Sequence, residues 1–394
     1  MGGQTAGLER NRKRRRRCER GDRQWPSLCD VKFSFVLSVT GGKMAKVILC
    51  RSKVIGSISL VALACYIGFE IIYWPVHIDI CPDPNEDPGF YNGGDKADDL
   101  TIVTMFLNIG SIYSTKFYYI KVMSSSVKDY HVWLHSWSKI NNRVVAFFDD
   151  DSFIKEFKAH RFHLPKEFTT ILKVSKDNLP AFRSREQVEQ ILRDPLFTPS
   201  YAAEYTCTMD AKYDALDLAL SGGHVRTKYV AWMDIGLFRK IKTTDPLFSL
   251  APPPGLNTSR VGVSQVTARS EVEKLSETEI YRQNIVWVAG GFLIAIRPVM
   301  VQFIRNYREI SAQLKMRGLA DTDQQVIASM YSPTEQGKYR DIQLTTYSCP
   351  RGAFGLYGYK YLYFCLPYIC KASSECKARA AYDATPIKSS RLIR

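Results

Sequence analysis

Long uninterrupted apolar runs, rather than alternating ones, recur through the middle of the chain and predict strands that are buried on both faces. These runs are Leu100–Gly110, Arg143–Asp151 and Tyr229–Met233. Between and after them, apolar residues recur at helical spacing over residues 186–194, 201–221 and 298–318. Strands that alternate with helices in this way indicate an α/β fold with a mostly parallel sheet flanked by helices.

Other segments carry weaker patterns. We expect helices over 116–123 and 130–140, a strand over 168–174, and a Pro- and Gly-rich loop over 245–262. The run 284–296 predicts a pair of strands interrupted by two adjacent glycines. These segments fill the spaces between the main strands without changing the predicted fold class.

Residues 54–74 are apolar around the whole circumference of a helix, and Glu70 is their only charge. About 20 apolar residues suffice for a helix to cross a bilayer, so this segment predicts a transmembrane span rather than a buried core helix. Lys46, Arg51 and Lys53 precede it and acids follow it. Because positive charge stays on the cytoplasmic side, we expect a single-pass type II signal-anchor with the body in the lumen of the Golgi or ER.

Cysteine and glycosylation patterns agree with that compartment. Of the 10 cysteines, those that follow the predicted span are Cys81, Cys207, Cys349, Cys365, Cys370 and Cys376. An even number in an oxidising lumen permits disulfides but does not reveal their connectivity. Asn257 begins an Asn-Thr-Ser sequence in the Pro- and Gly-rich loop, and we expect a glycan there.

Positive charge is concentrated at the N-terminus. The formal net charge is +15, and residues 1–53 hold 14 Lys and Arg against 4 Asp and Glu. The run Arg12–Arg17 suits a nuclear-import or phosphate-binding patch, or a solvated cytoplasmic tail. We favour the tail because a predicted span follows. The rest of the chain is nearly balanced in charge, so we expect no nucleic-acid partner.

Acidic residues follow two of the predicted strands. Asp149 and Asp234 lie at the carboxyl ends of their apolar runs. Ligands of open α/β sheets gather at that edge, so we expect Asp234 to face a ligand while the strand behind it holds it rigidly. A helix N-cap or a salt bridge to Arg239 is the alternative.

Four segments, in this order along the chain, resemble the HtrL/YibB family, which is poorly characterised and glycosyltransferase-like. They are "TIVTMFLNIG", "YVAWMDIGLFRK", "VAGGFLIAI" and "DTDQQVI", and the resemblance covers about residues 100–345. It implies a GT-A-like (Rossmann-like) fold, a nucleoside-diphospho sugar as donor substrate and a glycan, protein or lipid acceptor. Metal-dependent enzymes of that fold commonly present Asp-x-Asp, whereas here Asp234 is followed by Ile235 and Gly236.

The resemblance also implies roles for single residues. Asp323 and Asp321 are expected to act as the base or to orient the acceptor, and Asp234 to contact Mn²⁺ or Mg²⁺ at the diphosphate. The expected donor-binding residues are Thr104, Phe106, Asp149, Arg161, Lys212, Asp234, Gly290 and Gly291. The structural alternatives are acids that complement a helix dipole, a solvated lysine, and a β-bulge or tight turn at the glycines.

Five parts are expected along the chain. They are a basic cytoplasmic tail (1–53), a transmembrane signal-anchor (54–74), a stem (75–99), a glycosyltransferase-like domain (100–345) and a Cys- and Tyr-rich C-terminal extension (346–394). The expected function is transfer of a sugar to a luminal acceptor. Because the second acid of Asp-x-Asp is missing, a membrane-tethered protein that binds a glycan or nucleotide sugar without catalysis is the alternative.

Overall fold

The computed structural model describes Cys81 and residues 99–116, 120–194, 202–335, 337–339, 341–356 and 360–383. The predicted tail (1–53), the predicted span (54–74) and all of the predicted stem except Cys81 and Asp99 lie outside these residues. None of the helices in the described ranges combines the length and the apolar character needed to cross a bilayer.

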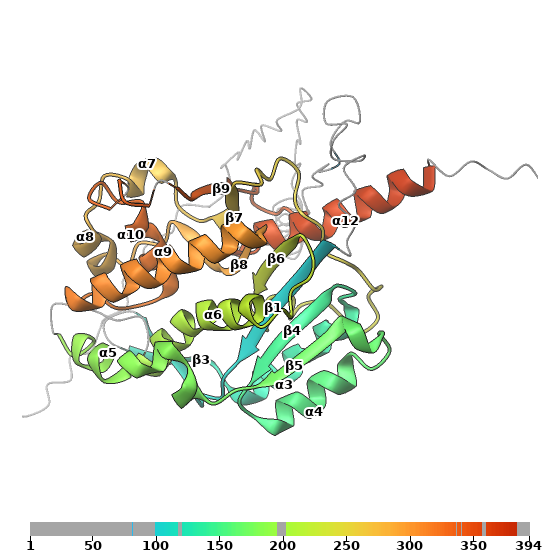
Figure 1. Cartoon of the computed structure of the whole chain (residues 1–394), viewed down its shortest axis with the longest axis horizontal. Coiled ribbons are helices and arrows are strands. Elements are labelled where there is room, and N and C mark those ends of the chain that lie inside the picture. The colour runs from blue at the N-terminus through green and yellow to red at the C-terminus, as the bar shows by residue number, and fades with distance from the viewer. Residues whose placement is uncertain are drawn as a thin grey trace, which may run out of the picture. The chain divides into compact units, whose positions relative to one another are not determined.

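Most of the described strands belong to one mixed sheet (Figure 1). The strands are β1 Leu100–Phe106, β2 Ile112–Lys116, β3 Ile120–Ser125, β4 Arg143–Phe148, β5 Thr169–Lys173, β6 Tyr229–Met233, β7 Arg260–Gln265, β8 Val288–Ile296 and β9 Gln343–Tyr347. The seven-stranded sheet has the order β5-β4-β1-β6-β8-β7-β9, and β2 and β3 form a separate antiparallel hairpin.

Helices connect these strands and cover the sheet. They are α3 Val127–Trp133, α4 Asp151–His160, α5 Arg185–Ile191, α6 Ala203–Ser221, α7 Arg269–Val272, α8 Glu277–Arg282, α9 Arg297–Met316, α10 Asp323–Met330, α11 Lys360–Tyr363 and α12 Cys365–Asp383. Short 3₁₀ helices occupy Leu134–Lys139 (η2), Lys166–Phe168 (η3), Lys176–Asn178 (η4) and Pro180–Ser184 (η5). The predicted helices over 186–194, 201–221 and 298–318 correspond to α5, α6 and α9.

The sheet is parallel in one half and mixed in the other. Strand β1 pairs parallel with β4 and β6, and β4 pairs parallel with β5. Strand β8 runs antiparallel to both β6 and β7, and β7 pairs parallel with β9. Within the described seven-stranded sheet, β8 is the strand that runs against the others, because β7 and β9 have the same direction as β6. The fold is therefore mixed α/β with a mostly parallel sheet, as expected.

Both faces of the sheet are buried, which explains the uninterrupted apolar runs. Along β1, Ile102 packs into one hydrophobic cluster and Val103 into the other, because successive side chains point to opposite faces. The cluster that contains Val103 adds side chains from α6, α9 and α10. The cluster that contains Ile102 adds side chains from α4, η2 and α12. In Figure 1 the strands β1, β4 and β5 lie between α4 and α9.

Two local predictions are wrong. Lys116 ends β2 and residues 120–123 belong to β3, so these positions are extended instead of helical, with Lys116 opposite Ile120. The sequence of this segment combines three aromatic residues with Ile120 and Val122, and aromatic and β-branched side chains favour extended backbone. Residues 288–296 form the single strand β8 instead of two strands. The glycines do not end the strand. Strand β6 pairs with β8 from Phe292 to Ile296, and the register of the β7–β8 pairing shifts beside the glycines, between Leu293 and Val288.

The C-terminal segment is part of the same body. Strand β9 spans Gln343–Tyr347 and crosses the predicted boundary at residue 345. On α12, the side chain of Leu366 is buried in the core, and its backbone N–H donates a hydrogen bond to Ser264 Oγ at 3.0 Å. The backbone carbonyl of Cys370 accepts a hydrogen bond from the N–H of Ala251 at 3.0 Å. The predicted extension therefore completes the folded domain.

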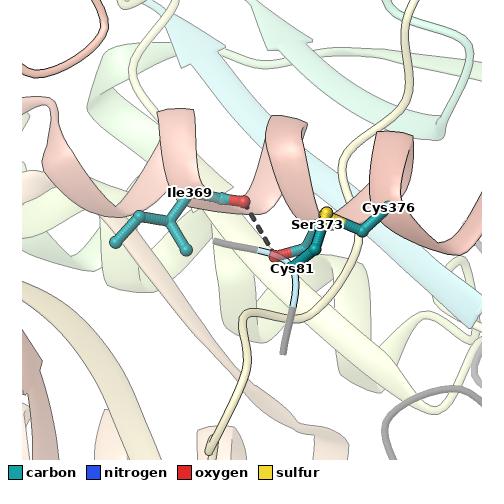
Figure 2. Close-up of a disulfide and its surroundings, with 4 residues drawn as sticks. All are labelled: Cys81, Ile369, Ser373 and Cys376. Atoms are coloured by element: carbon teal, nitrogen blue, oxygen red, sulfur yellow. Dashed lines mark hydrogen bonds between the residues drawn. A yellow bond between two sulfur atoms is a disulfide. The ribbon is translucent and has the colours of Figure 1, made fainter. Parts of the chain in front are cut away.

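Two disulfides fasten this segment. Cys349 pairs with Cys365, and Cys81 pairs with Cys376 across 295 residues of sequence. Figure 2 shows Cys81 beside α12, where Ser373 Oγ donates a hydrogen bond to the Ile369 carbonyl at 2.8 Å. The first described residue is thus joined covalently to the last described helix.

Arg161 is a structural residue at the amino ends of β4 and β5. Its side chain is buried and donates five hydrogen bonds. The acceptors are Thr169 Oγ1 and the carbonyls of Trp137, Ile140, Asn142 and Phe168. Burial lowers the pKa of Arg161 to about 9, so the side chain remains charged at neutral pH. It lies at the opposite end of the parallel strands from a ligand site, and the expected role in framing the nucleotide is wrong.

Substituting Arg161→Met removes these donors and leaves buried carbonyl oxygens without partners. We expect the free energy of unfolding to fall by about 3 kcal/mol, as measured by urea denaturation followed by circular dichroism. The matched control is Arg193→Met, whose exposed side chain pairs with Glu189. It should change stability by less than about 0.5 kcal/mol. Equal losses in the two variants would contradict the structural role of Arg161.

Candidate functional site at the carboxyl ends of β1 and β6

A cavity of about 330 Å³ opens where β1 and β6 end. Small-molecule sites usually enclose about 300–1,000 Å³, so this space suits a compact ligand. Its lining includes Phe106 from the end of β1, and Asp234 and Arg239 from the segment after β6. Tyr130 and Trp133 of α3 add two further aromatic rings. The position agrees with the expectation that ligands gather at this edge of the sheet.

Asp234 presents one carboxylate oxygen to the cavity. Its Oδ1 accepts a hydrogen bond from Trp232 Nε1 at 2.8 Å and lies 3.3 Å from Lys212 Nζ. The backbone N–H of Asp234 donates to the Gly291 carbonyl at 2.9 Å, which continues the β6–β8 ladder. The side chain is 43% exposed. Within the described residues no hydrogen bond occupies Oδ2, so this oxygen is available to a ligand.

Neither structural alternative for Asp234 is observed. A run of turns follows it, so it does not cap a helix. Its ion-pair partner is Lys212 and not Arg239. The guanidinium of Arg239 instead lies over the ring of Trp133, 4.8 Å from the ring centroid.

Lys212 is the buried centre of the site. It projects from α6, is 3% exposed, and places Nζ 3.2 Å from Asp323 Oδ2 and 3.2 Å from the Gly290 carbonyl. Its Nζ also lies 5.9 Å from the centroid of the Trp232 ring. The expectation of a solvated lysine is wrong, because two carboxylates and a carbonyl replace the water that burial removes.

Charges in this cluster stabilise one another. Burial opposes the charge of Lys212, but the carboxylates of Asp234 and Asp323 outweigh it and raise the pKa of the ammonium. Burial raises the pKa of Asp323, and Lys212 acts against that shift. Because Nζ lies within 3.3 Å of both carboxylates, the ammonium of Lys212 bridges the two acids.

Asp323 lies beneath the cavity wall and does not line it. It is the first residue of α10, whose N-terminus is fixed by a capping box between Thr322 and Gln325. Both Asp321 and Asp323 are buried. A general base must reach the hydroxyl that it deprotonates, so the structure does not bring these acids to an acceptor. Asp323 instead positions Lys212.

The two glycines let the backbone of β8 pass close to the acids. A Cβ added at Gly290 would lie 2.1 Å from Asp323 Oδ2, and one added at Gly291 would lie 3.2 Å from Asp234 Oδ2. The glycines lie in β8 without positive φ, at the place where the register of the β7–β8 pairing shifts between Leu293 and Val288. They therefore serve close approach at an irregular stretch of the strand, as the bulge alternative expected, and do not form a tight turn. Gly291 lines the cavity, whereas Gly290 contributes its carbonyl to Lys212.

The remaining predicted donor-binding residues fall into two groups. Phe106 lines the cavity. Thr104 is buried in β1 and Asp149 lies at the end of β4, and neither belongs to the lining. The carboxylate of Asp149 accepts two hydrogen bonds from the backbone N–H of Asn108, at 2.8 and 3.1 Å. Asp149 therefore shapes the loop after β1.

Asn257 lies on an exposed turn directly before β7. Its Oδ1 accepts hydrogen bonds from the backbone N–H and hydroxyl of Ser259, at 2.8 and 2.7 Å. The side chain is therefore accessible, and glycosylation of Asn257 stays a prediction.

Sequence reasoning missed three contributors to the site. Trp232 orients Asp234, and Trp133 and Phe364 line the cavity. Trp232 had a readable signal, because residues two apart in a strand share a face. Trp133 and Phe364 come from α3 and from the turn before α12, and no local pattern connects these segments to β6.

Asp234 is the carboxylate that could contact a metal at the cavity. In the described ranges, no group of three His, Cys, Asp or Glu side chains is placed to hold a metal ion. Among the residues that line the cavity, Asp234 is the sole carboxylate, and the ammonium of Lys212 lies beside it. Mg²⁺ is often held by one or two carboxylates, with substrate phosphates and waters completing its six oxygen ligands. Contact of Asp234 with Mn²⁺ or Mg²⁺ therefore stays a prediction, and we assign no step of the reaction to a metal.

A family model described as "Bacterial protein of unknown function (HtrL_YibB)" matches residues 98–336. This match covers more than half of the chain. The chain belongs to the HtrL_YibB family. The match contains every residue discussed at the site except Phe364, and it bears out the resemblance carried by the four motifs. No curated protein matches the sequence.

Two solved structures are similar in part to this HtrL_YibB chain. Mouse xyloside xylosyltransferase 1, in its apo form, is 10% identical with a TM-score of 0.31 and covers 64% of this chain and 86% of its own. The mannosyltransferase Ktr4p from S. cerevisiae is 12% identical with a TM-score of 0.34, and the match covers 72% of this chain and 84% of Ktr4p. Likeness at this level carries no argument about the chemistry of the HtrL_YibB chain.

The close approach of β8 to Asp323 makes a stability prediction. Substituting Gly290→Ala forces a methyl group against a carboxylate that is buried and held by Lys212, so the free energy of unfolding should fall by about 2–3 kcal/mol. The matched control Gly291→Ala meets the half-exposed Asp234, which can move, and should cost less than about 1 kcal/mol. Urea denaturation midpoints measure both. Equal stability of the two variants would show that Asp323 does not pack against β8 as described.

Proposed function

We propose that this chain is a glycosyltransferase that takes a nucleoside-diphospho sugar and transfers its sugar to a hydroxyl of a luminal glycan, protein or lipid. The observation that carries the proposal is the cavity at the carboxyl ends of β1 and β6. Aromatic rings, one accessible carboxylate and a guanidinium line the same space. The resemblance of the HtrL_YibB motifs to glycosyltransferase-like proteins supports the same conclusion.

The aromatic wall suits a base or a sugar ring. Phe106 and Tyr130 have ring centroids 4.8 Å apart, and so do Tyr130 and Trp133. The three rings are contiguous along one side of the cavity. Aromatic faces stack on nucleobases, and each such contact is worth about 1–3 kcal/mol. This wall supplies binding energy without requiring a charged partner.

Asp234 is placed to orient the reacting sugar. Its Oδ1 is held by Trp232 and Lys212, which leaves Oδ2 able to accept a hydrogen bond from a ligand in the cavity that Asp234 lines. In the transfer, the acceptor oxygen forms a bond to the anomeric carbon. The bond from that carbon to the diphosphate oxygen breaks, and its electron pair leaves with the nucleoside diphosphate. The proton of the acceptor hydroxyl passes to Asp234 or to the departing diphosphate.

One observation favours a second candidate, a protein that binds a glycan or nucleotide sugar without catalysis. The two acids expected to act as base, Asp321 and Asp323, are buried beneath the cavity. A binding protein needs Asp234 and the aromatic wall but no base. The two candidates differ in turnover, and the experiment below separates them.

Membrane topology belongs to the same proposal. The type II signal-anchor at 54–74 lies outside the described residues, and its support is the apolar sequence with basic residues before it. The disulfides Cys81–Cys376 and Cys349–Cys365 suit an oxidising lumen such as that of the Golgi or ER. Protease treatment of intact microsomes should leave the region from Cys81 onward protected, and its digestion without detergent would refute a luminal body.

Donor screening tests the enzymatic proposal. The purified full chain is mixed with a panel of nucleoside-diphospho sugars, and the shift in melting temperature identifies the donor, because a ligand that binds only the native state stabilises it. Hydrolysis or transfer of that donor is then measured in EDTA and in Mn²⁺. Turnover supports the transferase, and binding without turnover supports the binding protein.

The variant Asp234→Asn sharpens this test. Its amide oxygen still accepts the Trp232 hydrogen bond, but the negative charge that faces the sugar is lost. We expect kcat for hydrolysis or transfer to fall by about 10²-fold or more. The melting temperature should fall moderately, because the buried Lys212 loses the charge of one of its two carboxylate partners and keeps that of Asp323. Asp151→Asn is the control, because Asp151 is exposed, pairs with Lys173 and lies outside the cavity lining. Full activity in Asp234→Asn would remove this residue from the mechanism.

A further inference from the structure

Three basic side chains gather beside the cavity and are separate from the Lys212 cluster. Arg239 lines the cavity, Lys240 follows it in sequence, and Lys360 begins α11. Across the described part of the chain, none of the three forms an ion pair with a carboxylate. The next acid along the chain, Asp245, accepts a hydrogen bond from the backbone N–H of Lys242 instead. The three positive charges are therefore uncompensated by the protein.

Arg239 is held in a fixed orientation. Its guanidinium carbon lies 4.8 Å from the centroid of the Trp133 ring and 5.7 Å from that of the Phe364 ring. Both rings line the same cavity. Aromatic faces hold a guanidinium through its flat surface, which leaves its N–H edge free to form paired hydrogen bonds with an anion.

Lys240 and Lys360 bring further positive charge to the same place. The ammonium of Lys240 lowers the pKa of Lys360, and burial and Arg239 contribute in the same direction. Like charges this close repel each other, and an anion bound among them removes the repulsion. Both lysines are exposed, so an anion entering from solvent reaches them directly.

We propose that Arg239, Lys240 and Lys360 bind the diphosphate of the sugar nucleotide at the rim of the cavity that Asp234 lines. This inference rests on the proposed function and names the group that these residues recognise. A diphosphate fits because its oxygens accept paired hydrogen bonds from a guanidinium and single ones from ammonium groups.

Direct binding of inorganic pyrophosphate tests the site. The purified full chain is titrated by calorimetry at constant ionic strength in EDTA, with sulfate as the comparison anion. We expect pyrophosphate to bind the wild-type chain at least about tenfold more tightly than sulfate. The double variant Lys240→Gln with Lys360→Gln should weaken pyrophosphate binding by about tenfold or more. Arg239→Gln should do the same.

Lys173→Gln is the matched control, because Lys173 is exposed on β5 and lies outside the cavity lining. It should leave the affinity within about twofold of wild type. Melting temperatures verify that each variant is folded, and the two exposed lysines keep the test valid if Arg239→Gln is unstable. Absence of pyrophosphate binding, equal binding of sulfate, or wild-type affinity in the double variant would overturn the proposal.

Two further outcomes separate the diphosphate site from the transferase activity. If the double variant transfers a sugar with the wild-type KM for its donor, the diphosphate site is wrong although the enzymatic function stands. If pyrophosphate binding follows the three variants while no donor is turned over, the diphosphate site stands and the transferase is wrong.

Discussion

A single buried ammonium organises the candidate site. Lys212 of α6 reaches under the sheet edge and is neutralised by Asp234 after β6 and Asp323 at the start of α10. An isolated charge cannot be buried at this depth, and removing one partner of such a pair typically costs about 3–5 kcal/mol. The three elements and the Gly290 carbonyl of β8 are therefore fixed relative to one another by one constraint.

This constraint gives different roles to two acids, Asp323 and Asp234, that look alike in the sequence. Asp323 has almost no exposed surface, and its carboxylate forms an ion pair with Lys212. Asp234 shares the same lysine through one oxygen and keeps the other at the cavity surface. Since Trp232 holds that carboxylate as well, a rigid strand end supplies an oriented, negatively charged group. Of the cations proposed to oppose it, Arg239 and Lys240 follow closely along the chain, and Lys360 comes from α11.

Much of this architecture was predictable, and the failures have physical reasons. Periodicity identified α6 and α9, and strand ends identified Asp234, because both depend on local burial patterns. The burial of Lys212 and Arg161 was not predictable, since a basic residue in a helix usually faces water and only distant carbonyls and carboxylates reverse that preference. The antiparallel course of β8 was also hidden, because its apolar run looks the same in either direction.

The bond between Cys81 and Cys376 also bears on how the protein could be released from a membrane. Many anchored luminal proteins are shed when a protease cuts the segment that follows their anchor. Here any cut between Cys81 and β1 leaves the body attached through α12 to whatever precedes Cys81. Shedding would require cleavage before Cys81, or cleavage combined with reduction of that bond.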